Sequence, residues 1–220
     1  EISLGGSSQS QKAHISYAIL KHLNLKGMFI ANNDIGARKT YEDLLNFFES
    51  GVLYFPPEEV IFHDIEAKSY DSTYERIKSL YKIINGEYEI IITSPEAIGK
   101  KLIDKELFYN SIISFSVGKC VDLYDISKSL VSIGYERMSV VEGEGQFAVR
   151  GGIVDIFPIN SEVAVRIEFF DDEIDSIRSF DVISQRSLEK IEKVTVLPAR
   201  ELIYHADRRE EMLNKISDNL

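Results

Sequence analysis

The stretch that decides the fold of this chain is GEGQFAVRGGIVDIFPINSEVAVRIEFFDDEIDSIRSFDVISQRS, residues 143–187. Its centre alternates in character, as a strand does whose successive side chains point to opposite faces of a sheet. We predict that one face turns toward a core and carries Val163, Val165, Ile167 and Phe169. The other face turns toward solvent and carries Ala164, Arg166, Glu168 and Phe170.

A second strand precedes this one and is joined to a third by a pair of glycines. In Phe147–Arg150, alternation places Arg150 on the face opposite to Phe147. Gly151 and Gly152 permit a tight turn into the apolar strand Ile153–Phe157. Asp155 interrupts that strand, and we expect it to make a structural hydrogen bond or ion pair rather than to act as a base.

The outer face of this sheet therefore combines two arginines with an exposed aromatic ring. Arg150, Arg166 and Phe170 are of the residue types that are enriched in the centres of protein interfaces. Single exposed apolar residues are also common on ordinary solvated surfaces. Periodicity alone leaves both interpretations open, an interface and a solvated sheet face with one stray ring.

The same residues carry a resemblance to a known family. The strings GQFAVRGGIVDIFP, VRIEFFDDEIDSIRSFD and SQRS resemble the N-terminal module of the bacterial transcription-repair coupling factors (Mfd). That module is itself similar to part of the excinuclease B protein (UvrB). The resemblance extends in weaker form over essentially all 220 residues.

This resemblance implies a fold and a partner. It implies a parallel-sheet, RecA-like α/β domain with a degenerate P-loop over residues 1–112, an inserted α+β domain over residues 113–193, and a segment 194–220 that returns to the first domain. In the family, the inserted domain binds the excinuclease A protein (UvrA). The matching contact positions are Arg150, Arg166 and Phe170, and we expect Glu168 to hold the guanidinium groups in place. RNA polymerase, DNA and an ATP-dependent translocase involve other parts of the family protein.

The residues themselves also indicate two domains. Apolar segments at Met28–Ala31, Val52–Phe55 and Ile90–Ile92 alternate with helical patterns, such as the one around Ile19 and Leu23, and this order predicts a parallel sheet. From about residue 113 the pattern changes to one helix followed by closely spaced strands. We expect this helix to begin after Asp122.

A glycine-rich segment near the start resembles a phosphate-binding loop that has lost key residues. Such a loop requires the pattern G-x-x-x-x-G-K-[ST]. Gly6 and Lys12 fit, but Gln11 replaces the second glycine and Ala13 replaces the magnesium-binding hydroxyl. We therefore expect no bound nucleotide and no other cofactor.

Composition limits the remaining functions. A net charge of −11 argues against a surface built to bind nucleic acid. The one cysteine, Cys120, cannot form an internal disulfide, which agrees with a cytoplasmic location. We also expect no membrane segment. Asp171-Asp172-Glu173 is interpreted as a turn and not as a metal site. The charged end of the chain suggests a piece of a longer polypeptide.

Two alternatives stay open beside the non-catalytic adaptor: an ATP-binding motor fragment and a damaged-DNA-binding fragment of the excinuclease B type. In excinuclease B a long aromatic hairpin that grips DNA leaves the first domain near a segment similar to YFPPEEV. Here only Ile61–Ser72 is available at that place, which is too short for such a hairpin.

Overall fold

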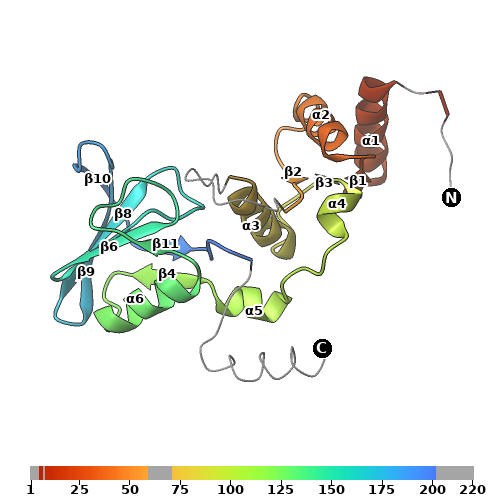
Figure 1. Ribbon diagram of the computed structural model, residues 1–220. Helices are drawn as coiled ribbons and strands as arrows, with labels where there is room; N and C mark the ends of the chain where they lie inside the picture. The colour runs from red at the N-terminus through yellow and green to blue at the C-terminus, as the bar shows by residue number, and fades with distance from the viewer. Residues whose placement is uncertain (1–4, 7, 59–70, 202–220) are drawn as a thin grey trace, which may run out of the picture. The chain divides into compact units, whose positions relative to one another are not determined.

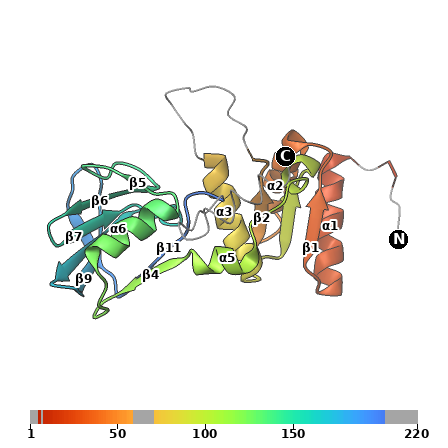
Figure 2. The same ribbon diagram turned by 60° about the horizontal axis from the view of Figure 1, so that its bottom comes forward.

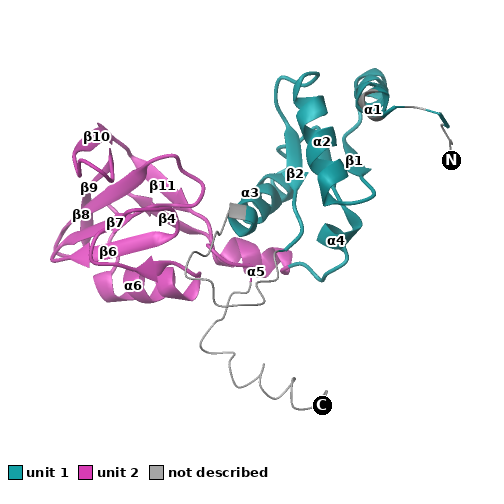
Figure 3. Ribbon diagram, turned by 45° about the horizontal axis from the view of Figure 1, so that its top comes forward, with its two compact units in different colours: residues 1–102 teal, residues 103–220 magenta. Residues whose placement is uncertain are grey.

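The computed structural model describes residues 5, 6, 8–58 and 71–201 of the chain. The chain divides into two compact units, Glu1–Leu102 and Ile103–Leu220, which Figure 3 colours separately. Both units mix helices with strands, as expected of an α/β protein. Within the described residues, no helix has the length and apolar character that crossing a lipid bilayer requires.

The first unit is built on a three-stranded parallel sheet (Figure 1). Side by side, its strands are β1 (Gly27–Ile30), β3 (Ile90–Thr93) and β2 (Val52–Phe55). Every residue of β2 and β3 is buried, which explains why their sequences are apolar runs rather than alternating patterns. The predicted parallel sheet is confirmed.

Helices cover both faces of this sheet. They are α1 (Gln9–Leu23), α2 (Asp34–Leu45), α3 (Asp71–Ile84) and the short α4 (Pro95–Ile98). Ala13 of α1 and Leu44 of α2 share a buried cluster with Tyr54 and Ile92 of the sheet. On the other face, the Ser79 hydroxyl of α3 donates to the Tyr54 carbonyl at 2.8 Å. Figure 2 shows α1 and α3 on opposite sides of the sheet.

The buried side of α1 differs from the prediction. Ile19 and Leu23, expected on the apolar face, are 46% and 55% exposed. Ala13, Tyr17 and Leu20 pack on the core instead. These three residues follow the spacing i, i+4, i+7 of one helix face, and the helix carries apolar residues on its outer face as well, so the pattern alone did not distinguish the two faces.

The second unit follows the order that the sequence predicts, one longer helix and then closely spaced strands (Figure 1). Its elements are α5 (Lys105–Asn110), β4 (Ile113–Ser116), α6 (Leu123–Ser132), β5 (Glu136–Arg137), β6 (Gln146–Arg150), β7 (Ile153–Ile156), β8 (Ala164–Phe170), β9 (Glu173–Phe180), β10 (Ser187–Lys190) and β11 (Lys193–Val196). Asp122 is the N-cap of α6, as expected, and its carboxylate accepts from the backbone of Tyr124 at 2.6 Å.

The strands of this unit form two sheets. One has six strands in the order β10-β9-β8-β7-β6-β5, and the other pairs β11 with β4 in antiparallel fashion. Helix α6 packs on the face of the large sheet that carries Phe147 and Val149. Tyr135 connects distant segments, because its hydroxyl donates to the Leu197 carbonyl at 3.1 Å and accepts from the Ile159 backbone at 3.2 Å.

The three-part division into residues 1–112, 113–193 and 194–220 stays a prediction. Strand β11 pairs with β4 of the second unit. Residues 202–220, which hold most of the expected returning segment and its terminal helix, lie outside the described residues. So do residues 59–70, which include most of the segment Ile61–Ser72.

A buried arginine ties α3 to the rest of the first unit. Arg76 is 2% exposed, and its Nη1 donates to the carbonyl oxygens of Pro56 at 2.5 Å and Ala97 at 3.4 Å. The guanidinium also lies 4.3 Å from the centroid of the Phe55 ring. One side chain therefore satisfies carbonyls after β2 and in α4.

Replacing Arg76 by alanine should destabilise the first unit by about 2–3 kcal/mol, because two carbonyl groups lose a charged donor in a dry environment. Urea unfolding followed by circular dichroism measures this change. Lys82→Ala, an exposed position on the same helix, is the control and should leave the midpoint nearly unchanged. Equal midpoints for the two variants would contradict the structural role of Arg76.

Candidate partner-binding surface

Neighbouring strands bring the predicted arginines to one face of the large sheet. Asp155 of β7 lies opposite Ala148 of β6 and Arg166 of β8 in the antiparallel register. Paired residues share a face, and Arg150 lies two residues from Ala148 on the same strand. Arg150, Asp155 and Arg166 therefore project from the face opposite to α6.

The carboxylate of Asp155 binds both arginines. Arg166 donates from Nε to Oδ1 at 2.7 Å and from Nη2 to Oδ2 at 2.9 Å, which is a bidentate pair. Arg150 donates from Nη2 to Oδ2 at 2.5 Å. These contacts confirm the expected structural ion pair. Its carboxylate is buried, because the Asp155 side chain is 1% exposed.

The two arginines differ in how much of each side chain is exposed to solvent. The Arg166 side chain is 16% exposed, and its guanidinium also stacks on the Phe180 ring, 4.7 Å from the centroid. The hydrogen bonds to Asp155 raise the pKa of Arg166, so it stays charged. The Arg150 side chain is 48% exposed and holds Asp155 through one nitrogen only. Arg166 is thus largely engaged within the chain, whereas Arg150 reaches solvent.

Phe170 is an exposed residue at the end of β8. The ring is 79% exposed, as the alternation predicts. It pairs with Glu173 across the hairpin, whose turn at Asp171 and Asp172 includes a left-handed residue, Asp171 with φ 57°. Asp171 and Asp172 thus form the predicted turn, whereas Glu173 already belongs to β9. Within the described residues no cluster of three or more potential metal ligands is found.

Glu168 does not have the predicted role. Its Oε2 accepts from the Ser176 hydroxyl at 2.5 Å and lies 3.6 Å from Nη2 of Arg178. Asp155, and not Glu168, holds Arg150 and Arg166. The reason is the register, since Glu168 lies opposite Ile153 and Ser176, two pairs further along the strands than the pair of Asp155 with Arg166.

The outer face is also less solvated than predicted at one end. Ala164, expected in solvent, is fully buried, and Val163, expected in the core, is 38% exposed and precedes β8. Ala164 joins a small second cluster with Val141, Ala148 and Phe180 on this face. Loop residues therefore cover one end of the sheet, and Phe170 lies at the other, open end.

At the segment predicted to be a degenerate phosphate loop, α1 begins with an ordinary capped helix start. The Ser8 hydroxyl accepts from the backbone N–H of Gln11 at 3.4 Å, and the Gln11 side chain accepts from the Ser8 N–H at 2.8 Å. This capping box satisfies amides of α1 that a phosphate would otherwise bind. Ala13 is fully buried in the core, and Lys12 is exposed. Gly6 keeps a positive φ of 75°.

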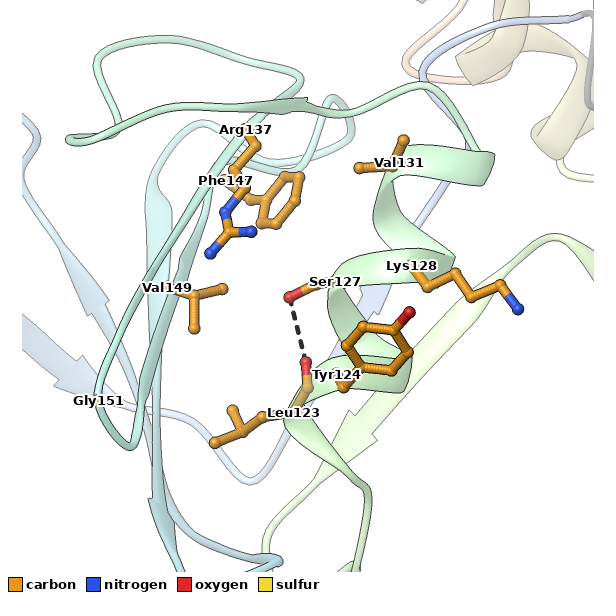
Figure 4. A pocket seen from close by; sticks show the side chains of 9 residues that line it. All are labelled: Leu123, Tyr124, Ser127, Lys128, Val131, Arg137, Phe147, Val149 and Gly151. Carbon is orange, nitrogen blue, oxygen red and sulfur yellow. Dashed lines mark hydrogen bonds between the residues drawn. The ribbon is translucent and has the colours of Figure 1, made fainter.

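A separate hollow of about 480 Å³ lies between α6 and β6, on the other face of the sheet (Figure 4). Figure 4 shows the Arg137 guanidinium directed toward it, while Lys128 points away. The Ser127 hydroxyl is engaged with the Leu123 carbonyl at 3.1 Å. The lining contains no carboxylate, imidazole or thiol, so it lacks the side chains that bind zinc.

Comparison with known proteins agrees with this architecture. Residues 113–202, from β4 to just beyond β11, match the family model described as the UvrB interaction domain. The chain is 34% identical over 218 residues, 99% of its length, to the transcription-repair-coupling factor of Bacillus subtilis (strain 168). It is 35% identical over 216 residues, 98% of its length, to the transcription-repair-coupling factor of Staphylococcus aureus (strain bovine RF122 / ET3-1). The chain spans 18% of the length of each of these relatives.

The six-stranded sheet with its covering helix thus corresponds to the part of the chain that matches the UvrB interaction domain. Over nearly its whole length the chain belongs to the transcription-repair-coupling factor family. It corresponds to a part of the longer proteins of that family.

We expect Asp155→Asn to lower the free energy of unfolding of the second unit by about 2 kcal/mol, because it removes the charge that neutralises Arg166 in a mostly buried place. Thermal and urea unfolding measure the loss. Asp175→Asn removes the same charge from an exposed position on β9 and is the matched control. If both variants unfold alike, Asp155 does not organise this face.

Proposed function

We propose that this chain is a non-catalytic adaptor whose second unit binds the excinuclease A protein (UvrA) and so recruits nucleotide excision repair to stalled RNA polymerase. The observation that carries the proposal is Phe170, 79% exposed on the strand that also carries Arg166, one of the two arginines ordered by Asp155. The names of the matching domain and relatives support a role in coupling transcription to repair.

Binding would use the ring as its anchor. Transferring a phenylalanine side chain from water into an apolar pocket contributes about 1.5–3 kcal/mol. The hairpin holds Phe170 at the end of a paired strand, so little conformational freedom is lost when it inserts. Arg150, with half of its side chain in solvent, supplies a charge-assisted hydrogen bond to an acidic group of the partner.

Arg166 contributes in a different way. Because its donors already hold Asp155, it fixes the carboxylate that in turn orients Arg150. We therefore expect Arg166→Ala to lower stability as well as binding, whereas Phe170→Ala should affect binding alone.

We propose further that the first unit derives from a nucleotide-binding motor fold and has lost its phosphate loop. The parallel sheet, the left-handed Gly6 and the helix start that follows support this origin. The capping box and the buried Ala13 favour a purely structural role for this helix start.

Phe170→Ala should weaken binding of the chain to purified excinuclease A by at least about 2 kcal/mol, roughly 30-fold in Kd, with an unchanged melting temperature. Calorimetric titration measures this affinity. Tyr124→Ala removes an aromatic ring of similar exposure, 76%, from α6 on the other side of the sheet, and should bind like the unmodified chain.

Two results would contradict the proposal. One is wild-type affinity of the Phe170→Ala variant, and the other is an equal loss of affinity with Tyr124→Ala. A mobility shift with damaged duplex DNA and a titration with a labelled ATP analogue test the two alternative functions, and neither should give saturable binding.

A further inference from the structure

A third arginine lies on the same face as Arg150 and Arg166. In the register of β8 and β9, Arg178 is directly opposite Arg166, and in the register of β9 and β10, Lys190 is opposite Arg178. Three cations thus lie side by side on adjacent strands of a chain whose net charge is −11. Phe170 is on the same strand as Arg166, an even number of residues away.

Like charges placed directly opposite each other destabilise a pair of strands unless a countercharge compensates them. Arg166 has its countercharge in Asp155, at hydrogen-bonding distance. The nearest carboxylate oxygen to Arg178 among the described residues is Oε2 of Glu168, 3.6 Å from Nη2, which is beyond a hydrogen bond. That oxygen accepts from the Ser176 hydroxyl at 2.5 Å instead.

The hydrogen-bonding capacity of Arg178 is consequently unused within the described part of the chain. Its Nε is buried and has no hydrogen-bond partner among the described residues, and none of its other nitrogens donates a hydrogen bond there either. The side chain is nevertheless 38% exposed, so part of the guanidinium reaches solvent. A charged donor held in this state is costly for the free chain and available to an incoming acceptor.

We propose that Arg178 is a direct partner contact that receives a carboxylate of the bound protein, while Arg166 is a positioning residue that holds Asp155. This inference rests on the proposed function and adds to it the chemistry of the partner surface. That surface presents an aspartate or glutamate side chain in addition to the apolar pocket that takes the Phe170 ring. A guanidinium suits this role because its parallel N–H groups bind a carboxylate in bidentate fashion.

The competing explanation is structural: Arg178 and Glu168 form a solvent-screened ion pair that only stabilises the hairpin. Such pairs contribute little in general. The two explanations differ in what they predict for binding, because a structural pair matters equally in the free and the bound chain.

The test measures the affinity of the chain for purified excinuclease A with Arg178→Gln, Arg178→Lys and the control Arg137→Gln. Arg137 is an exposed arginine on β5, at the edge of the same sheet and with its guanidinium on the α6 side (Figure 4). Arg178→Gln should weaken binding at least about tenfold, with no loss of melting temperature and with a smaller dependence on salt. Arg178→Lys should recover only part of the affinity, since an ammonium cannot bind in bidentate fashion. Arg137→Gln should bind normally.

The outcomes separate this inference from the function on which it rests. If Phe170→Ala loses affinity and Arg178→Gln does not, the inference is overturned and the proposed function stands. If Arg178→Gln loses affinity only in step with its melting temperature, the structural explanation is correct and the inference is again overturned. If Phe170→Ala binds like the unmodified chain, the proposed function itself fails.

Discussion

One buried carboxylate organises the outer face of the second unit. Asp155 accepts three hydrogen bonds from two arginines that come from strands on either side of it. A buried charge is tolerated only when it is paired and hydrogen-bonded, so the positions of Arg150 and Arg166 are coupled to each other through Asp155. The exposed part of this face is consequently ordered before any partner arrives, which reduces the entropy lost on binding.

On this face, some side chains hold others in place and different ones reach solvent. Arg166 is enclosed by Asp155, Gln185 and the Phe180 ring, so it acts mainly within the chain. Arg150 and Phe170 both reach solvent, with 48% of the Arg150 side chain and 79% of Phe170 exposed. Sequence resemblance assigned one role to all these positions, and the burial of each side chain now suggests different ones.

In the first unit, local packing at the start of α1 is incompatible with a phosphate-binding loop. A phosphate-binding helix start needs free backbone amides and a flexible glycine. Here Gln11 closes a capping box with Ser8, and Ala13 fills the core where a hydroxyl would serve a metal. Both residues that interrupt the phosphate-loop pattern therefore stabilise the start of this helix.

The sequence by itself determined the parallel sheet of the first unit, the order of one helix and several strands in the second, and the exposed Phe170, because these follow from periodicity over short segments. Asp155 was recognised as structural, but its two partners depend on strand pairing. The sequence pattern also could not predict the register of β9. From the pairing of Phe170 with Glu173, a regular hairpin would place Arg178 opposite Val165, yet a bulge between Glu168 and Phe169 shifts it opposite Arg166. Only the tertiary structure decides this, because an extra residue in one strand turns every later side chain of that strand to the other face.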